Sequence, residues 1–249
     1  MHSRRRRSAR SAARCCVSSF ASNFSKPYRR RSDVGLPRIA NYNLPTVAEI
    51  PAARARWAFD PGRAALLIHD MQNYFVGAFV PDASPITPVI ANIARLKAAA
   101  SAAGMPVLYT AQTGNQDRRD RGLQADLWGA GMSNTPDHQP IIDPLRPTAG
   151  DIVFVKHRYS AFQMSNLAHV MQVRGRDQLV ISGIYAHIGC LMTAGEAFQR
   201  DIKPFFAADA VADFSRERHE MALDYVAATC GIPLSVDALV SAMERRAAA

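Results

Sequence analysis

The chain lacks several patterns that mark common classes of protein. No apolar run approaches the roughly 20 residues that a membrane-spanning helix needs, so we expect no contact with a membrane. There is no Gly-rich phosphate loop of the GxGxxG or GxxxxGK type, and there is no HExxH or paired-cysteine metal motif. The sequence therefore predicts neither a nucleotide cofactor nor a bound metal ion.

Cysteine is scarce, with four residues in 249. Cys15 and Cys16 are adjacent, whereas Cys190 and Cys230 stand alone in the body of the chain. This spacing builds no disulfide framework and is typical of a reducing compartment. We therefore expect a cytoplasmic protein.

Acidic residues are absent from the first 32 positions, which hold nine arginines and Lys26. The rest of the chain has 20 basic and 21 acidic residues, so the formal charge of +9 comes from this segment alone. A nearly neutral body offers no basic surface for nucleic acid, and we expect no such partner. We predict a disordered basic tail over residues 1–33 and one globular domain over 34–249. A transit peptide, or a translation start near Val34, would also explain the composition.

From Arg63 onward, short apolar runs alternate with segments of helical spacing. This alternation predicts an α/β domain with a doubly wound, mainly parallel sheet of about six strands. Each run is nearly continuous in apolar residues, as in a strand that is covered on both faces. The predicted strands are 64–69, 106–110, 152–156, 179–183, 204–208 and 231–235.

Four helices are predicted between these strands. The first has Thr87 as its N-cap and Pro88 at its first helical position. The others are indicated by apolar residues at helical spacing from Leu167 and Leu191, and by a group that follows Ser215.

Polar residues follow three of the predicted strands, where the ligands of open parallel sheets bind. Asp70 follows the first strand, Lys156 closes the third, and a turn through Gly189 follows the fourth. Taken singly, Asp70 is also explained as a helix cap and Lys156 as a solvated strand end. Their combination at one sheet edge favours a catalytic site.

Six segments resemble, in order and at compatible spacing, the motifs of the isochorismatase family. The family includes enzymes of catechol-siderophore synthesis and the closely similar hydrolases of phenazine synthesis. The resemblance runs from about Arg38 to Val240 and implies a three-layer αβα, Rossmann-like fold with strand order 3-2-1-4-5-6. The segments are LLIHDMQNYF, LYTAQ, FVKHRYSAF, ISGIYAHIGC, RDIKPF and ADAVADFSRERH.

The resemblance implies hydrolysis of the enolpyruvyl vinyl ether of isochorismate to pyruvate and 2,3-dihydro-2,3-dihydroxybenzoate. Asp70 would be the general acid, and Lys156 would stand beside it as the second catalytic residue. Burial would raise the pKa of Asp70 and Lys156 would lower it, and the sequence leaves open which effect prevails. In the implied strand order, Lys156 must reach Asp70 from a strand that is not its neighbour.

The substrate contacts are also implied by the resemblance. Gln112 and Arg121 match positions that hold carboxylate or hydroxyl groups of the substrate, and Tyr185 and Gly189 line the same pocket. Apolar walls are expected from two further residues, Trp128 and Phe162.

One departure concerns the nucleophile of the related cysteine amidases. Their cysteine matches Gly189 here, and Cys190 comes one residue later. One step along a helix turns a side chain by about 100°, so Cys190 should point away from Asp70. A second departure is His157, where relatives usually carry Trp, which would alter the pocket wall.

Alternatives and partners stay open at this point. The same chemistry on 2-amino-2-deoxyisochorismate, a cysteine amidase that uses Cys190, and an inactive scaffold for a synthetase are the competing interpretations. We expect a small-molecule substrate and a homodimer, with a siderophore synthetase as a further partner. The chain ends at Ala249 without room for a carrier-protein domain, so a free product is expected.

Overall fold

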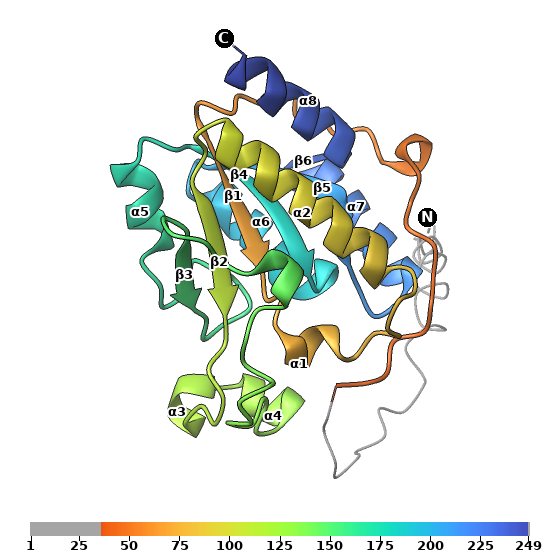
Figure 1. The fold of residues 1–249 in the computed structure, drawn as a ribbon, viewed down its shortest axis with the longest axis vertical. Coiled ribbons are helices and arrows are strands. Elements are labelled where there is room, and N and C mark those ends of the chain that lie inside the picture. The colour runs from red at the N-terminus through yellow and green to blue at the C-terminus, as the bar shows by residue number, and fades with distance from the viewer. Residues whose placement is uncertain (1–35, 249) are drawn as a thin grey trace, which may run out of the picture. The chain divides into compact units, whose positions relative to one another are not determined.

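The computed structural model describes residues 36–248 (Figure 1). The tail predicted over residues 1–33 lies outside the described residues, as do the alternatives to it. Among residues 36–248, the helices fall short of the length and apolar character that crossing a bilayer requires.

A six-stranded sheet has the order β3-β2-β1-β4-β5-β6, and each of its pairings is parallel. The predicted fold class and strand order are therefore confirmed. All six predicted strands exist, and the fifth runs four residues beyond its predicted end. The strands are β1 (Ala64–His69), β2 (Val107–Ala111), β3 (Ile152–Val155), β4 (Gln178–Ile184), β5 (Lys203–Ala212) and β6 (Ile232–Leu234).

Helices cover both faces of this sheet (Figure 1). One core joins the sheet to α2 (Ile86–Ala102) and α8 (Val236–Ala247). The other joins it to α5 (Leu167–Val173), α6 (Leu191–Gln199) and α7 (Arg216–Thr229). The three layers arise because central strands such as β1 are buried along their whole length and need apolar cover on both sides.

Two predictions about local structure are wrong. Helix α2 begins at Ile86 after Pro85, so Thr87 is not its N-cap and Pro88 lies inside the first turn, where a missing N–H costs little. Strand β3 is not covered on both faces, because Val153 and Val155 are 45% and 47% exposed. As an edge strand, β3 receives less cover than the centre of the sheet.

Helix α7 begins as predicted, with the Ser215 side chain accepting a hydrogen bond from the Arg218 N–H. Helix α8 was not predicted, although Ser235 caps it and its buried residues Val236, Leu239 and Met243 follow helical spacing. The signal was therefore present in the sequence.

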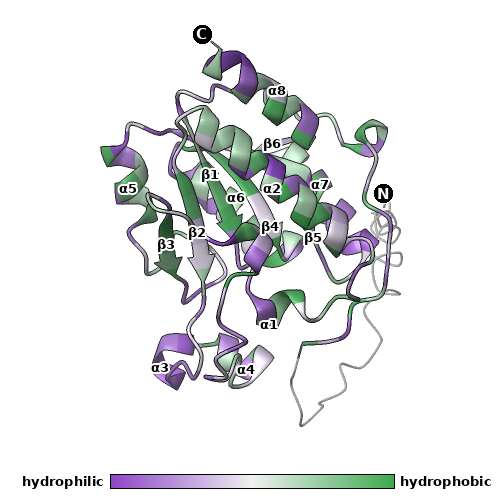
Figure 2. Cartoon of the chain, in the orientation of Figure 1, coloured by the Kyte–Doolittle hydropathy of each residue, from purple (hydrophilic) through white to green (hydrophobic). Residues whose placement is uncertain are grey.

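The connection from β2 to β3 carries two short helices, α3 (Arg118–Arg121) and α4 (Gln124–Trp128), which lie beyond the carboxyl ends of the strands (Figure 1). Figure 2 shows that α3 is strongly hydrophilic, in contrast to β1 and β3. Short segments complete the chain: η1 (Val47–Glu49), α1 (Asn73–Val76), η2 (Asp143–Leu145) and the π-helical η3 (Ala186–Cys190).

The chain order reverses between β1 and β4, which are neighbours in the sheet. Because the connections on either side of such a point diverge, they leave a crevice at the carboxyl ends of the strands. Asp70 follows β1 and Tyr185 follows β4, so the fold places both residues at this crevice.

Candidate active site

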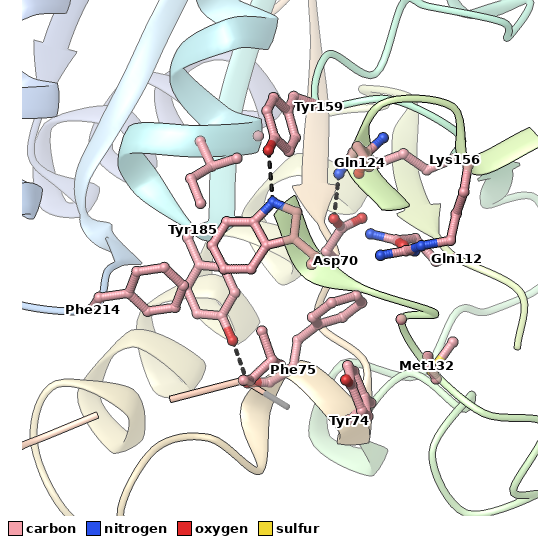
Figure 3. A pocket seen from close by; sticks show the side chains of 16 residues that line it. Asp70, Tyr74, Phe75, Gln112, Gln124, Met132, Lys156, Tyr159, Tyr185 and Phe214 are labelled. Carbon is pink, nitrogen blue, oxygen red and sulfur yellow. Dashed lines mark hydrogen bonds and ion pairs between the residues drawn. The ribbon is translucent and has the colours of Figure 1, made fainter. Parts of the chain in front are cut away.

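A pocket occupies this crevice and brings together seven of the eight site residues predicted from the sequence (Figure 3). In Figure 3, Asp70 lies between Tyr185 and Phe214 on one side and Gln112 and Lys156 on the other. The lining residues are Leu36, Asp70, Tyr74, Phe75, Gln112, Arg121, Gln124, Trp128, Gly131, Met132, Lys156, Tyr159, Tyr185, Ile188, Gly189 and Phe214.

Asp70 and Lys156 form a buried ion pair at the pocket floor, and each residue is only 5% exposed. The Lys156 Nζ donates to Asp70 Oδ2 at 2.5 Å. The Thr110 Oγ1 donates to the other carboxylate oxygen, Oδ1, at 2.6 Å. Thr110 was not predicted as a site residue, although it lies in the quoted LYTAQ segment.

The geometric difficulty over Lys156 is resolved at the end of β2. Because β2 separates β3 from β1, the Lys156 side chain must bridge about two strand spacings of roughly 4.8 Å each. The Lys156 N–H donates to the Ala111 carbonyl, so its backbone still pairs with β2 where β3 ends. The flexible four-carbon side chain then crosses the end of β2 to reach Asp70.

The backbone at Asp70 has a φ of 51°, in the left-handed region that few non-glycine residues adopt. The Asp70 N–H donates to the Thr110 carbonyl and lies 3.1 Å from Thr110 Oγ1. Strained conformations of this kind persist where neighbours hold them, and they cluster at active sites. The turn at Asp70 directs the carboxylate into the pocket.

Burial of the Asp70 carboxyl group raises its pKa, but the nearby ammonium of Lys156 and the hydrogen bonds to the carboxylate outweigh burial. The pKa of Asp70 therefore lies well below its usual range in the empty pocket. Asp70 is thus ionised at neutral pH before a ligand binds.

Gln112 is held at the pocket wall by the fully buried Gln72. The Gln72 side chain donates to the Gln112 carbonyl at 2.8 Å and accepts from the Gln112 N–H at 2.7 Å. Arg121, from α3, is 5% exposed, and its Nε donates to the Gly129 carbonyl. Burial lowers the pKa of Arg121, but an arginine side chain stays charged at neutral pH. Lys156 and Arg121 therefore give the lining one more positive than negative charge.

Aromatic side chains form the opposite wall. The Tyr185 hydroxyl donates to the Phe75 carbonyl, and the Tyr185 ring packs 4.4 Å from that of Phe214. The Trp128 Nε1 donates to the Tyr159 hydroxyl at 2.6 Å, which ties α4 to the segment after β3. Tyr159 and Phe214 were not predicted, although they lie in the quoted segments FVKHRYSAF and ADAVADFSRERH.

Gly189 lines the pocket, whereas Cys190 is fully buried in the core on the α6 side of the sheet. Burial raises the pKa of the Cys190 thiol well above its usual value. A reactive cysteine needs an accessible thiolate, and Cys190 is neither accessible nor ionised.

Phe162 is the predicted site residue that the structure places elsewhere. It lies in the core below α6, and the Arg200 guanidinium stacks over its ring at 5.3 Å from the centroid. It does not line the pocket. The chain turns after Ser160 towards α5, and this turn places Phe162 in the core on the α5 and α6 side of the sheet. His157 also lies outside the pocket lining.

Within residues 36–248, no group of three or more His, Cys, Asp or Glu side chains is placed to hold a metal ion. The pocket instead combines a carboxylate, an ammonium, a guanidinium and an aromatic wall. Such a set can bind an organic anion and transfer a proton to it. Fold and site together define an α/β protein with a buried carboxylate–ammonium pair in a pocket at the carboxyl edge of a parallel sheet.

The chain belongs to the isochorismatase family, because the isochorismatase domain matches residues 64–238. It is 51% identical over 211 residues to the "Isochorismatase" of Bacillus subtilis (strain 168), a match that covers 85% of this chain and 68% of that protein. It is 48% identical to "Enterobactin synthase component B" of Escherichia coli (strain K12), over 84% of this chain and 73% of that protein. It is 45% identical to "Phenazine biosynthesis protein PhzD" of Pseudomonas fluorescens, over 83% and 99% respectively.

Proposed function

We propose that the chain hydrolyses isochorismate to pyruvate and 2,3-dihydro-2,3-dihydroxybenzoate. One observation carries this proposal: the Asp70 carboxylate lines the pocket beside Lys156, and Gly189 stands at the position that matches the nucleophile of the related cysteine amidases. Hydrolysis of a vinyl ether needs an acid and water, whereas hydrolysis of an amide by this superfamily needs a cysteine.

The reaction begins when Asp70 donates its proton to the terminal methylene carbon of the enolpyruvyl group. The O–H bond of Asp70 breaks and a C–H bond forms, which leaves an oxocarbenium ion and a carboxylate. Water adds to the cationic carbon and gives a proton back to the Asp70 carboxylate, so that a hemiketal forms. The hydroxyl proton of the hemiketal passes to the ring oxygen as the C–O bond breaks, which gives pyruvate and the ring alcohol. Acid catalysis of this kind contributes roughly 10² to 10⁴ in rate.

Asp70 must hold a proton in the substrate complex, although its pKa is low in the empty pocket. The substrate carries two carboxylates, and like charge beside Asp70 disfavours its ionised form. A substrate carboxylate also competes with Asp70 for the ammonium of Lys156. Both effects raise the pKa of Asp70 when substrate binds.

The cationic and amide groups of the pocket supply anchors for the two carboxylates. Arg121 can bind a carboxylate through two parallel N–H donors. Gln112 offers an amide on the wall next to Lys156 (Figure 3). The aromatic wall of Tyr185 and Phe214 would pack against the ring of the substrate.

The runner-up substrate is 2-amino-2-deoxyisochorismate, which differs by one ring substituent. Asp70 is the single carboxylate among the described residues that line the pocket, and Lys156 already occupies it. A hydroxyl group therefore suits the lining better than an ammonium group, which would need a second acceptor. Higher identity to the Bacillus isochorismatase than to PhzD supports the same choice.

The test is pyruvate release from isochorismate in D₂O, with lactate dehydrogenase and NADH present to trap pyruvate at once. Because Asp70 exchanges with solvent before it donates to carbon, the methyl group of lactate should carry one deuterium. Absence of pyruvate, or lactate without methyl deuterium, would refute the proposal. Parallel assays with the amino analogue then rank the two substrates by kcat/KM.

We further propose that the enzyme acts in the cytoplasm as a homodimer on the route to a catechol siderophore, and that a siderophore synthetase is a further partner. Support comes from the similarity to an enterobactin synthase component. Light scattering of the purified chain would test the dimer.

A further inference from the structure

His69 lies directly beneath the catalytic pair and plays no part in the chemistry described so far. Its side chain is fully buried, and its Nδ1 lies 3.6 Å from Asp70 Oδ2. This Nδ1 has no hydrogen-bond partner among the described residues. A buried polar atom without a partner is costly and calls for a physical explanation.

The hydrogen bonds of Thr193 determine which ring nitrogen of His69 carries the proton. The Thr193 hydroxyl donates to the Gly189 carbonyl at 2.7 Å, so its only hydrogen is already used. The Oγ1 accepts from the Ala161 N–H at 2.9 Å and lies 3.2 Å from His69 Nε2. With its hydrogen committed to Gly189, Oγ1 can only accept from Nε2. His69 is therefore the Nε2–H tautomer, and its Nδ1 carries a lone pair.

That lone pair faces Asp70 Oδ2 across a gap too long for a hydrogen bond. Burial and the neighbouring Lys156 lower the pKa of His69, so the imidazole stays neutral. The Nδ1 lone pair repels Asp70 when the carboxylate is ionised. When Asp70 is protonated, the same lone pair can accept a hydrogen bond from its O–H group. Catalytic hydrogen bonds that are long in an empty site shorten when substrate binds.

Gly189 makes room for this imidazole, and Gly183 makes room for the backbone of the same residue. A Cβ at Gly189 would lie 2.3 Å from His69 Cε1, so no larger residue fits beside the ring. A Cβ at Gly183, where φ is +106°, would lie 2.2 Å from the His69 carbonyl oxygen. The ring therefore occupies the space beside position 189 that a nucleophile side chain would need.

We propose that His69 is a positioning residue, whose Nδ1 accepts a hydrogen bond from protonated Asp70 and so stabilises the acid form needed for proton donation. This role rests on the proposed function, because it concerns the proton that Asp70 gives to the vinyl ether. When substrate is bound, the O–H group of Asp70 turns from Nδ1 towards the pocket, its O–H bond breaks, and a C–H bond forms at the methylene carbon of the substrate.

The first test needs neither substrate nor a variant in the measured sample. Protein labelled with ¹⁵N in the histidine rings should show His69 as a neutral Nε2–H tautomer from about pH 6 to 9, with the resonance assigned by its loss in His69→Asn. An Nδ1–H tautomer, or an imidazolium at neutral pH, would overturn the proposal. This result stands whether or not isochorismate proves to be the substrate.

The second test compares two variants that each keep one half of the imidazole. In His69→Asn, the amide oxygen can stand near the position of Nδ1 and accept from Asp70. In His69→Gln, the amide stands near Nε2 and keeps the contact with Thr193, but the acceptor for Asp70 is lost. Thermal melts of both proteins, with circular dichroism, establish that they are folded.

For His69→Gln we expect kcat to fall about tenfold while KM stays within about twofold, as for a group that acts only in the chemical step. The alkaline limb of the kcat profile should move about one unit to lower pH, because Asp70 loses the bond that favours its protonated form. His69→Asn should restore both. The other titratable groups near His69 and Asp70 are Lys156, Tyr185 and Cys190, and these three residues are unchanged in both variants.

Thr193 supplies an independent check. Thr193→Val removes the acceptor that sets the tautomer, and it should lower kcat and move the same limb, whereas Thr193→Ser should not. If the parent enzyme releases pyruvate and His69→Gln keeps the parental kcat and pH profile, the role of His69 is overturned and the proposed function stands. If the parent releases no pyruvate, the proposed function fails and the role of His69 in proton donation fails with it, whereas the ring-nitrogen spectra still decide the tautomer.

Discussion

Two buried aspartates follow strands of the same sheet and have opposite surroundings. Asp70 follows β1, and Asp213 follows β5, two positions away in the strand order. Asp213 is fully buried and accepts from the His187 N–H, from His187 Nδ1 and from the Phe214 N–H. Two of these three donors are backbone groups, so Asp213 fastens the turn after β5 to the turn after β4.

Asp70 differs in what it leaves free. Among the residues that the structure describes, two side chains donate to it, Thr110 and Lys156, and it lines the pocket. Asp213 lines no part of that pocket. The carboxylate of Asp213, which is held mainly by backbone donors, therefore has a structural role. The carboxylate of Asp70, which is bound by side chains at the edge of a cavity, keeps oxygens available for a substrate.

The largest effect expected from this comparison is that of Asp70→Asn. The change keeps the volume of the side chain and removes the only titratable proton assigned to the reaction. Pyruvate release from isochorismate should fall by at least about 10², while KM should not rise, because like-charge repulsion with the substrate is lost. Steady-state kinetics measure both, and turnover near the parental rate would remove Asp70 from the mechanism.

Lys156 should come next. Lys156→Ala leaves the site without its ammonium group, and we expect kcat/KM to fall about 100-fold. In Lys156→Arg the positive charge remains, but the planar guanidinium fits this position differently, so kcat/KM should fall about tenfold. Lys203→Ala, at the start of β5 at the opposite edge of the sheet, is the matched control and should behave like the parent. Equal activity of both Lys156 variants and the parent would make Lys156 a structural residue.

Asp213→Asn should reverse the pattern seen for Asp70. The NH₂ group of Asn cannot accept a hydrogen bond, so one of the N–H donors that now bind Asp213 would lose its partner. The free energy of unfolding should therefore fall by about 1–3 kcal/mol. Urea denaturation measures this loss. The kcat of the folded enzyme should change by less than about threefold. A 100-fold loss of kcat with unchanged stability would mean that the two aspartates share the chemistry.

Cys190→Ala should have the smallest effect on turnover, because the thiol is buried outside the pocket and Gly189 occupies the nucleophile position. We expect parental kcat and KM, a modest loss of stability of about 1 kcal/mol, and resistance of the parent to iodoacetamide. Cys230→Ala is the matched control in the same core. Inactivation by Cys190→Ala alone would support the amidase alternative.

Much of the fold could be predicted from the sequence, because its signals are local. The continuous apolar runs mark all six strands, and apolar residues at helical spacing mark α2, α5, α6 and α7. Helix ends were less certain, as Thr87 shows, because Pro is tolerated at several positions of a first turn. The exposure of β3 depends on which strand lies at the edge, and a run such as IVFV does not encode its neighbours.

The site divides in the same way. Asp70, Lys156 and Gly189 could be proposed because each follows a strand, and the carboxyl ends of parallel strands share one edge. Tyr159 and Phe214 could not, since only the packing of distant segments brings them to the pocket. Phe162 was misplaced for the same reason: its direction depends on how the chain turns after Lys156, and the local sequence does not specify that turn.

The sequence by itself determined that Asp70 stands after an apolar strand and that no cysteine stands at position 189. It could not determine how the Asp70 carboxylate is held. Only the tertiary structure decided this, because the groups that hold Asp70 lie 40 and 86 residues away, at Thr110 and Lys156. Strand formation is a local property of the chain, whereas the charge, hydrogen bonds and exposure of a carboxylate are set by neighbours that folding brings to it.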